Sequence, residues 1–240
     1  MRRARDGGGR PISPRAHAAG TGATHGTAGS GPETAPSAAP LAAEASLSSE
    51  TLSAAEPIPP CDMFRVRPAA SGDIEAIRRI EVAAGEMFRG IGMDEIADDD
   101  PPTRGEIARA IESRGAWAAV DAADRPVGYL VASRLQGSLH VDQVTVHPDA
   151  ARRGIGRRLI SAADACAEAE GTGALTLTTF ARVPWNAPYY RRLGFSEMGA
   201  DGLPEDLAAV VAHEASLGLA RWPRVVMRRE CGAIRPPGRS

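Results

Sequence analysis

The first 62 residues set the strongest limit on what this 240-residue chain folds into. They consist mostly of Ala, Gly, Ser, Pro and Thr, with few bulky apolar side chains. Such a segment cannot bury enough surface to offset the entropy lost on ordering. We therefore predict a disordered extension over 1–62, with a mature start at Met63 as an open alternative. The folded part is then confined to residues 63–231, the size of one domain, and 232–240 form a disordered tail.

Charge and cysteine content narrow the class of protein. The formal net charge is −2, from 28 basic and 30 acidic residues, which gives no electrostatic footprint for nucleic acid or an anionic membrane. Cys61, Cys166 and Cys231 are scattered, which predicts a reducing compartment, no disulfide framework and no metal site. No apolar run approaches a membrane span, and no signal-peptide core follows Met1. We expect a cytoplasmic protein with no nucleic acid or membrane partner.

Hydrophobic periodicity predicts a mixed sheet with flanking helices, an α/β or α+β fold. Ser71 is a candidate cap for the first helix, and the acidic stretch 94–100 is an expected loop. Three strands joined by short turns form an antiparallel meander, after which helices and strands alternate. The predicted strands are 64–67, 117–120, 127–132, 139–146, 174–180, 195–198 and 224–228, and the predicted helices are 71–89, 103–113, 154–170, 186–193 and 204–217.

A glycine-rich turn between a strand and a helix carries the main functional signal. The sequence from Val144 to Leu159 runs from a buried strand through Gly154 and Gly156 into a helix. Helix N-termini present unpaired N–H groups and a positive dipole end, which together bind anions. The neighbouring arginines add charge suited to phosphate, so the favoured ligand is a pyrophosphate. A tight turn with solvated arginines is the open alternative.

Two nucleotide-binding motifs are excluded by the same stretch. A Walker A loop needs Gly-Lys-Ser/Thr, which is absent. The dinucleotide motif G-x-G-x-x-G fails because Leu159 stands where its third glycine is required.

Both this turn and a later segment resemble the GNAT N-acetyltransferase superfamily. Its signature, Gln/Arg-x-x-Gly-x-Gly/Ala after an apolar-x-Val-x-Pro strand end, matches at Val144, Val146, Pro148, Gly154 and Gly156 and departs at Ala151. The segment 185–195 looks like the family's Asn…Phe-Tyr-x-x-x-Gly-Phe motif, with a shorter spacing between Asn186 and Tyr190. The resemblance covers 63–230 and implies the GNAT fold, a twisted, mostly antiparallel sheet flanked by helices.

The resemblance also implies a chemistry. Acetyl-CoA serves as co-substrate and transfers its acetyl group directly to a primary amine of a small molecule or peptide. Its pantetheine arm lies where the strands containing Val144 and Phe180 splay apart, and Tyr190 matches the family's general acid. A homodimer is a further expectation from the family. The implied cofactor-binding residues are Val144, Thr145, Val146, Arg152, Arg153, Gly154, Ile155, Gly156, Arg157 and Asn186.

Several residues are candidates for the base that takes the amine proton. Asp142 lies on the strand leading into the glycine turn, and His140 lies two residues earlier on the same face. Glu81 on the first helix is a third candidate, although a solvated helix face is the favoured interpretation of it. Trp185 either shapes the acceptor cleft or packs in the core.

The sequence leaves the acceptor open. The acidic stretch 94–100 either attracts a cationic amine or is a solvated surface loop. A non-catalytic module that binds acyl-CoA is the alternative function. Only the enzyme would release free thiol in the presence of an amine.

Overall fold

The computed structural model describes residues 63–232, so the predicted extension 1–62 and residues 233–240 of the predicted tail lie outside the described part. Short 3-10 helices cover Ser71–Asp73, Pro148–Ala150 and Leu219–Arg221. The remaining elements are β1 (Arg65–Pro68), α1 (Ile74–Arg89), α2 (Asp94–Ala97), α3 (Arg104–Glu112), β2 (Ala116–Val120), β3 (Pro126–Leu135), β4 (Ser138–Val146), α4 (Ile155–Ala169), β5 (Ala174–Phe180), α5 (Ala187–Arg192), β6 (Ser196–Met198), α6 (Glu205–Ser216) and β7 (Arg224–Glu230).

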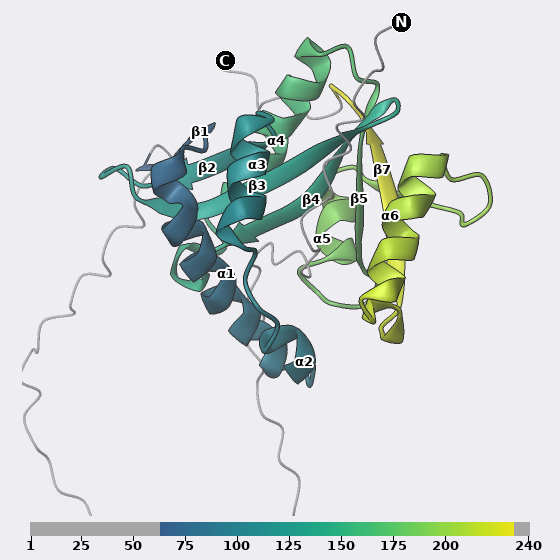
Figure 1. The fold of residues 1–240 in the computed structure, drawn as a ribbon, viewed down its shortest axis with the longest axis horizontal. Coiled ribbons are helices and arrows are strands. Elements are labelled where there is room, and N and C mark those ends of the chain that lie inside the picture. Colours follow the sequence, from purple (N-terminus) through teal and green to yellow (C-terminus); the bar gives the residue numbers. More distant parts are fainter. Residues whose placement is uncertain (1–62, 233–240) are drawn as a thin grey trace, which may run out of the picture.

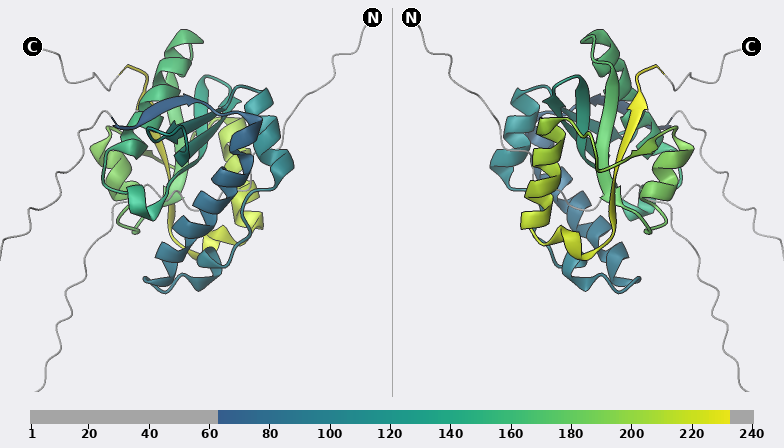
Figure 2. Two further views of the ribbon diagram at one scale, coloured as in Figure 1. Left: turned by 90° about the vertical axis from the view of Figure 1, so that its left-hand side faces the viewer. Right: turned by 90° about the vertical axis from the view of Figure 1, so that its right-hand side faces the viewer.

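One seven-stranded sheet organises the domain in the order β1-β2-β3-β4-β5-β7-β6. Only β4 and β5 pair in parallel, and the other neighbours are antiparallel. Helices α1, α3 and α6 cover one face of this sheet, and α4 and α5 cover the other (Figures 1 and 2). The mixed sheet confirms the predicted fold class. Because helices cover both faces, every residue of β2 and β5 is buried.

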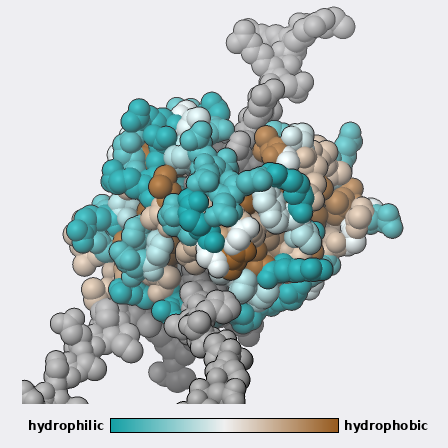
Figure 3. Space-filling model, turned by 90° about the horizontal axis from the view of Figure 1, so that it is seen from below, coloured by the Kyte–Doolittle hydropathy of each residue, from teal (hydrophilic) through white to brown (hydrophobic). Residues whose placement is uncertain are grey.

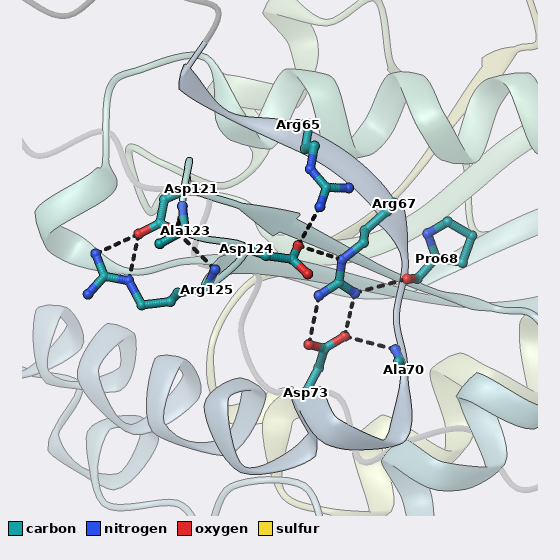
Figure 4. Close-up of polar contacts among 9 residues, drawn as sticks. All are labelled: Arg65, Arg67, Pro68, Ala70, Asp73, Asp121, Ala123, Asp124 and Arg125. Carbon is teal, nitrogen blue, oxygen red and sulfur yellow. Dashed lines mark hydrogen bonds and ion pairs between the residues drawn. The ribbon is translucent and has the colours of Figure 1, made fainter.

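The start of α1 is fixed by an ion-pair network rather than by the predicted Ser71 cap. The Arg67 guanidinium donates to both carboxylate oxygens of Asp73, at 2.7 and 3.0 Å, and to Asp124 at 2.9 Å (Figure 4). Asp73 also accepts the backbone N–H of Ala70 at 2.8 Å. Burial opposes ionisation of Asp73, but these hydrogen bonds outweigh it and lower its pKa. The network ties β1, α1 and the β2–β3 turn together.

Two other elements differ from the sequence expectation. The acidic stretch expected as a loop contains the short helix α2, whose Ile96 and Ala97 are buried. β3 continues to Leu135, so the hairpin turn to β4 is only Gln136 and Gly137. Apolar contacts and ladder hydrogen bonds extend both elements beyond what local periodicity indicates.

Helix α6 is inserted between β6 and β7 and lies on the sheet face that also carries α1 (Figure 2). Glu214 holds it there, because this buried carboxylate accepts from the Thr178 hydroxyl and from Arg224 Nε at 3.1 Å. At the other end of α6, Asp206 accepts the Gln136 N–H of the β3–β4 hairpin. The helix therefore spans from that hairpin to the far end of β5.

Candidate active site

An opening between β4 and β5 is the central feature of the site. Residues 138–141 pair with residues 174–177, and β4 then continues to Val146 and β5 to Phe180 with no pairing between them. Opposite β3, the register shifts so that Val131 faces Gln143 while Ala132 faces Val141, which leaves Asp142 as an extra residue. Such a bulge bends and twists its strand, which accounts for the separation of β4 from β5.

The splayed edge of β4 carries backbone groups that need a partner. Val144, Thr145 and Val146 are fully or almost fully buried, and within the described residues no strand pairs with them on the β5 side. Buried backbone N–H and C=O groups without partners cost free energy. An extended ligand lying along this edge would satisfy them.

The glycine turn leads from this edge into α4. Gly154 is the N-cap residue, with a left-handed φ of 74°, and no side chain caps the helix. A Cβ at Gly154 would meet nothing within 4 Å, so its backbone angle, and not crowding, requires glycine. The turn therefore leaves the first amides of α4 without a side-chain cap, beside the exposed Arg152, Arg153 and Arg157.

Gly128 on β3 positions this turn and was missed by the sequence analysis. A Cβ there would lie 3.3 Å from Ile155 Cγ2 and 3.0 Å from the Thr145 carbonyl oxygen. Glycine thus lets Ile155, the first residue of α4, pack directly on the sheet. An isolated glycine in a strand pattern signals such a close approach.

The four arginines of the turn do not share one role. Arg158 donates to the Phe64 carbonyl at 2.6 Å and so fixes the chain before β1. Arg153 lies over the Phe64 ring, 5.8 Å from its centroid. Arg157 is exposed on the first turn of α4, close enough to Tyr189 to oppose the rise in that phenol's pKa. The arginine cluster is therefore partly structural.

Asp142 and His140 are both buried on β4. Asp142 is 5% exposed and accepts from Ser133 Oγ at 2.9 Å. Burial raises its pKa to about 8, with a smaller electrostatic contribution from Glu214, while Ser133 acts in the opposite direction. Burial lowers the pKa of His140 to about 4, and its Nδ1 lies 3.0 Å from Thr176 Oγ1. Both side chains are thus mostly uncharged at neutral pH.

Glu81 does not lie on a solvated helix face, so that sequence interpretation is wrong. It is 3% exposed and accepts from the Tyr129 hydroxyl at 2.6 Å. Gln143 Nε2 lies 3.2 Å from its other oxygen and 2.8 Å from Thr145 Oγ1. The contacts link α1 to the splayed part of β4, because Gln143 follows the bulge.

Tyr190 lies in the core on the α4 side of the sheet. Its ring makes edge contacts with Tyr189 and Phe195, at 5.5 and 5.7 Å between centroids. Burial raises its pKa well above the usual range of a phenol. The hydroxyl therefore stays protonated at neutral pH.

Asn186 precedes α5 and has a fully buried side chain. Among the described residues, neither its amide oxygen nor its amide nitrogen has a hydrogen-bond partner. Such groups cost about 1–3 kcal/mol each and are rare in folded proteins. A ligand beside α5 would supply the missing partners.

A pocket of about 430 Å³ lies at the open end of β5. Its walls are Phe180 with residues 182–184, the α1–α2 connection at residues 91–93, and residues 222–223 before β7. The size is that of a small-molecule site. Because Phe180 is the last residue of β5, the pocket is next to the strand opening.

The acidic stretch near this pocket is largely neutralised. Arg89 bonds Asp98 at 2.7 Å and lies 3.5 Å from Asp94, and Arg221 pairs with Glu95. These contacts leave the stretch with less free charge than the sequence indicates.

Comparisons with known proteins agree with this architecture. A family model described as an acetyltransferase (GNAT) domain matches residues 112–197, which include the opening, the glycine turn and α5. An acetyltransferase of the GNAT family from Staphylococcus aureus superposes with a TM-score of 0.54 at 14% identity, covering 70% of this chain and 99% of that one. A GNAT-family acetyltransferase from Listeria monocytogenes gives 0.51 at 13%, covering 70% and 94%.

N-acetylglutamate synthase from Neisseria gonorrhoeae, in complex with coenzyme A and N-acetyl-glutamate, gives a TM-score of 0.52 at 17% identity. The match covers 70% of this chain but only 35% of that longer protein. Likeness at these identities shows the fold. The family match adds that residues 112–197 fit an acetyltransferase (GNAT) domain.

Two further features of residues 63–232 bear on its class. None of the helices in this part combines the length and apolar character that a membrane crossing needs. In the same residues, no group of three or more His, Cys, Asp or Glu side chains is arranged to hold a metal ion.

Proposed function

We propose that this protein transfers the acetyl group of acetyl-CoA to a primary amine by direct attack. The observation that carries this proposal is the opening between β4 and β5, which leads at one end to the uncapped amides of α4. A strand edge without a partner suits an extended amide-containing arm. A helix N-terminus with a glycine cap suits a pyrophosphate.

The residues around the opening fit coenzyme A as a ligand. The edge at Val144 and Val146 would bond the pantetheine amides, and the amides from Gly154 to Arg157 would bind the pyrophosphate. The buried amide of Asn186 offers a donor and an acceptor that no other residue of 63–232 uses. Arg152, Arg153 and Arg157 would neutralise phosphate charge.

The reaction forms an amide C–N bond at the acetyl carbon, breaks the C–S bond and releases a thiol, while the amine gives up one proton. An alkyl ammonium has a pKa of about 10, so loss of that proton at neutral pH costs roughly 4 kcal/mol. A base at the acceptor side is therefore needed, as is a hydrogen-bond donor at the sulfur.

Asp142 is the base best suited to this step. A base is most effective when its pKa is close to the working pH, and burial raises the pKa of Asp142 to about 8. His140 is neutral over the same range but, with a pKa of about 4, accepts a proton poorly. Asp142 would take the amine proton directly or through one water.

Tyr190 would act at the sulfur as a hydrogen-bond donor. A free thiol has a pKa of about 8.5, whereas burial raises the pKa of Tyr190 well above 10. Complete proton transfer from this phenol to a thiolate is therefore uphill. A hydrogen bond that strengthens as charge develops on the sulfur needs no transfer.

The test is an acceptor screen with acetyl-CoA, in which free thiol is measured. Acetyl-CoA should raise the Tm of the protein more than ATP or NAD does, and at least one amine class should release thiol. Binding of acetyl-CoA with no thiol release for any amine would identify a non-catalytic acyl-CoA-binding module instead. Absence of binding would remove both functions.

A further inference from the structure

The pocket at the end of β5 has a rigid aromatic wall. The rings of Phe180 and Trp222 meet edge to face, with centroids 6.0 Å apart. Behind them, Phe88 contacts both Phe180 and Trp185, at 6.0 and 5.5 Å. Such interlocked rings have little freedom to collapse into the pocket. Apolar surface at this end of the molecule interrupts a mainly hydrophilic exterior (Figure 3).

One charged side chain lines this apolar pocket. Arg182 is exposed at its edge, and among the described residues no carboxylate pairs with it. The two other arginines that contact the aromatic wall are each paired with a carboxylate. Arg224 lies over Phe180 but is paired with Glu214, and Arg221 lies over Trp222 but is paired with Glu95. Arg182 is therefore the cation left for a ligand.

A second hydrogen-bond donor lies in the hydrophobic cluster that includes Phe180 of the pocket wall. The indole Nε1 of Trp185 is buried, and within the described part of the chain it has no acceptor. Trp185 packs in one cluster with Phe180 and Val183, both of which line the pocket. No Asp or Glu side chain is among the lining residues. The pocket lining thus combines apolar walls with one positive charge and no acidic side chain, which suits an acid and disfavours a polycation.

The pocket is joined to the proposed transfer site by one short segment. From Phe180 at its wall, the chain runs through Val183 and Trp185 to Asn186 and then to Tyr190 in the next helix. The pocket residues Arg182 and Val183 therefore belong to the same β5–α5 connection that carries the buried amide of Asn186.

We infer that the acceptor is a carboxylated amine with an apolar, ring-sized body, such as an apolar α-amino acid. This inference rests on the proposed acetyl transfer. The apolar body fills the space between Trp222 and the α1–α2 connection, the carboxylate pairs with Arg182, and the amine faces the opening beside Asp142. A polyamine has no group to pair with Arg182, and a peptide N-terminus has no carboxylate at that position.

The test measures thiol release with acetyl-CoA and four acceptors: phenylalanine, phenylalanine methyl ester, spermidine and a short peptide. Phenylalanine should exceed its ester in kcat/KM by about tenfold, the worth of one charge-assisted pair. Arg182→Gln should abolish that preference while changing the ester less than about twofold. Arg182→Lys should keep part of the preference for phenylalanine over its ester. Arg109→Gln, which changes an exposed arginine on α3, should leave that preference unchanged.

A filled pocket gives an independent check. Ile91 is partly exposed on the pocket wall, so Ile91→Trp should reduce the space without disturbing the core. It should lower kcat/KM for phenylalanine several-fold and leave glycine, which needs no pocket, nearly unchanged. Equal losses for both acceptors would overturn the assignment of the pocket.

Binding separates this inference from the proposed function. N-acetylphenylalanine, titrated calorimetrically into the protein with coenzyme A, should bind about tenfold more weakly to Arg182→Gln than to the wild type. No binding at millimolar concentration would overturn the inference whatever the turnover. Acetylation of spermidine or the peptide, without phenylalanine, would also overturn it and would leave acetyl transfer intact. Absence of thiol release with every amine, despite binding, would remove the proposed function instead.

Discussion

The two sides of the strand opening are built in different ways. The side proposed for acetyl-CoA is made largely of backbone: the free edge of β4 and the uncapped turn at Gly154. The acceptor side is made of side chains from α1, α6 and three connections, brought together only by folding. Backbone geometry that holds a common ligand leaves a short, local sequence pattern. Side chains that select an individual acceptor come from distant parts of the chain and leave no such local pattern.

The largest expected effect tests the acceptor side at Asp142. Asp142→Asn keeps the shape of the side chain but removes the base, so kcat/KM for the amine should fall by about 100-fold or more. In the wild type, kcat/KM should rise with pH and level off above about 8, because the raised pKa keeps Asp142 protonated below that value. The variant should lose this dependence. The measurement is kcat/KM against pH, with the exposed Asp201→Asn as the control.

Thermal unfolding of the same variant separates a base from a structural side chain. The folded protein holds a proton on Asp142 up to about pH 8, whereas the unfolded chain releases it near 3.8. The stability from the neutral, buried acid is therefore complete below the lower value and is lost as pH rises to the upper one. Asp142→Asn should remove this loss and gain at least about 1 kcal/mol over wild type at pH 8. An unchanged Tm–pH profile would show that Asp142 ionises freely.

A smaller effect is expected at Tyr190, which lies on the far side of the sheet. Tyr190→Phe should reduce kcat about tenfold, the worth of one hydrogen bond to a charged group, while KM for acetyl-CoA stays within about twofold. Steady-state kinetics with free-thiol detection measures both. Tyr189→Phe is the matched control and should change kcat much less. A new basic limb in the pH profile of the wild type, absent from Tyr190→Phe, would instead indicate proton transfer by the phenol.

The sequence predicted the local backbone features of this protein better than the side-chain contacts made by folding. The strands, the glycine turn and the mixed sheet were predicted correctly because periodicity and turn residues are local signals. The burial of Glu81 was not predicted, because its partners Tyr129 and Gln143 are 48 and 62 residues away in the chain. The aromatic pocket was missed for the same reason, since its walls come from three separate connections. The role of Gly128 was visible only as an isolated glycine in a strand.

Gly154 tests the backbone side with a smaller effect. Alanine at a left-handed φ of 74° costs about 1–2 kcal/mol, and relief of that strain would turn the α4 amides away from the pyrophosphate. Gly154→Ala should therefore raise KM for acetyl-CoA several-fold and lower the Tm. Gly137 in the β3–β4 hairpin has a φ of 75° and similarly open surroundings, so Gly137→Ala should lower the Tm alone. A similar rise in KM for both variants would show that the effect comes from a general loss of stability and not from the α4 amides.

The smallest effect is expected at the acidic stretch 94–100, for which the sequence left open a role in attracting cationic amines. Arg89 lowers the pKa of Asp98 through its hydrogen bond and already balances its charge. Both side chains are exposed, so salt screens what field remains. Asp98→Asn should change the acceptor KM less than about twofold at low salt, far below the effect of Arg182→Gln. If Asp98→Asn instead raised KM for spermidine several-fold at low salt only, long-range attraction by this stretch, and not the pocket, would select the acceptor.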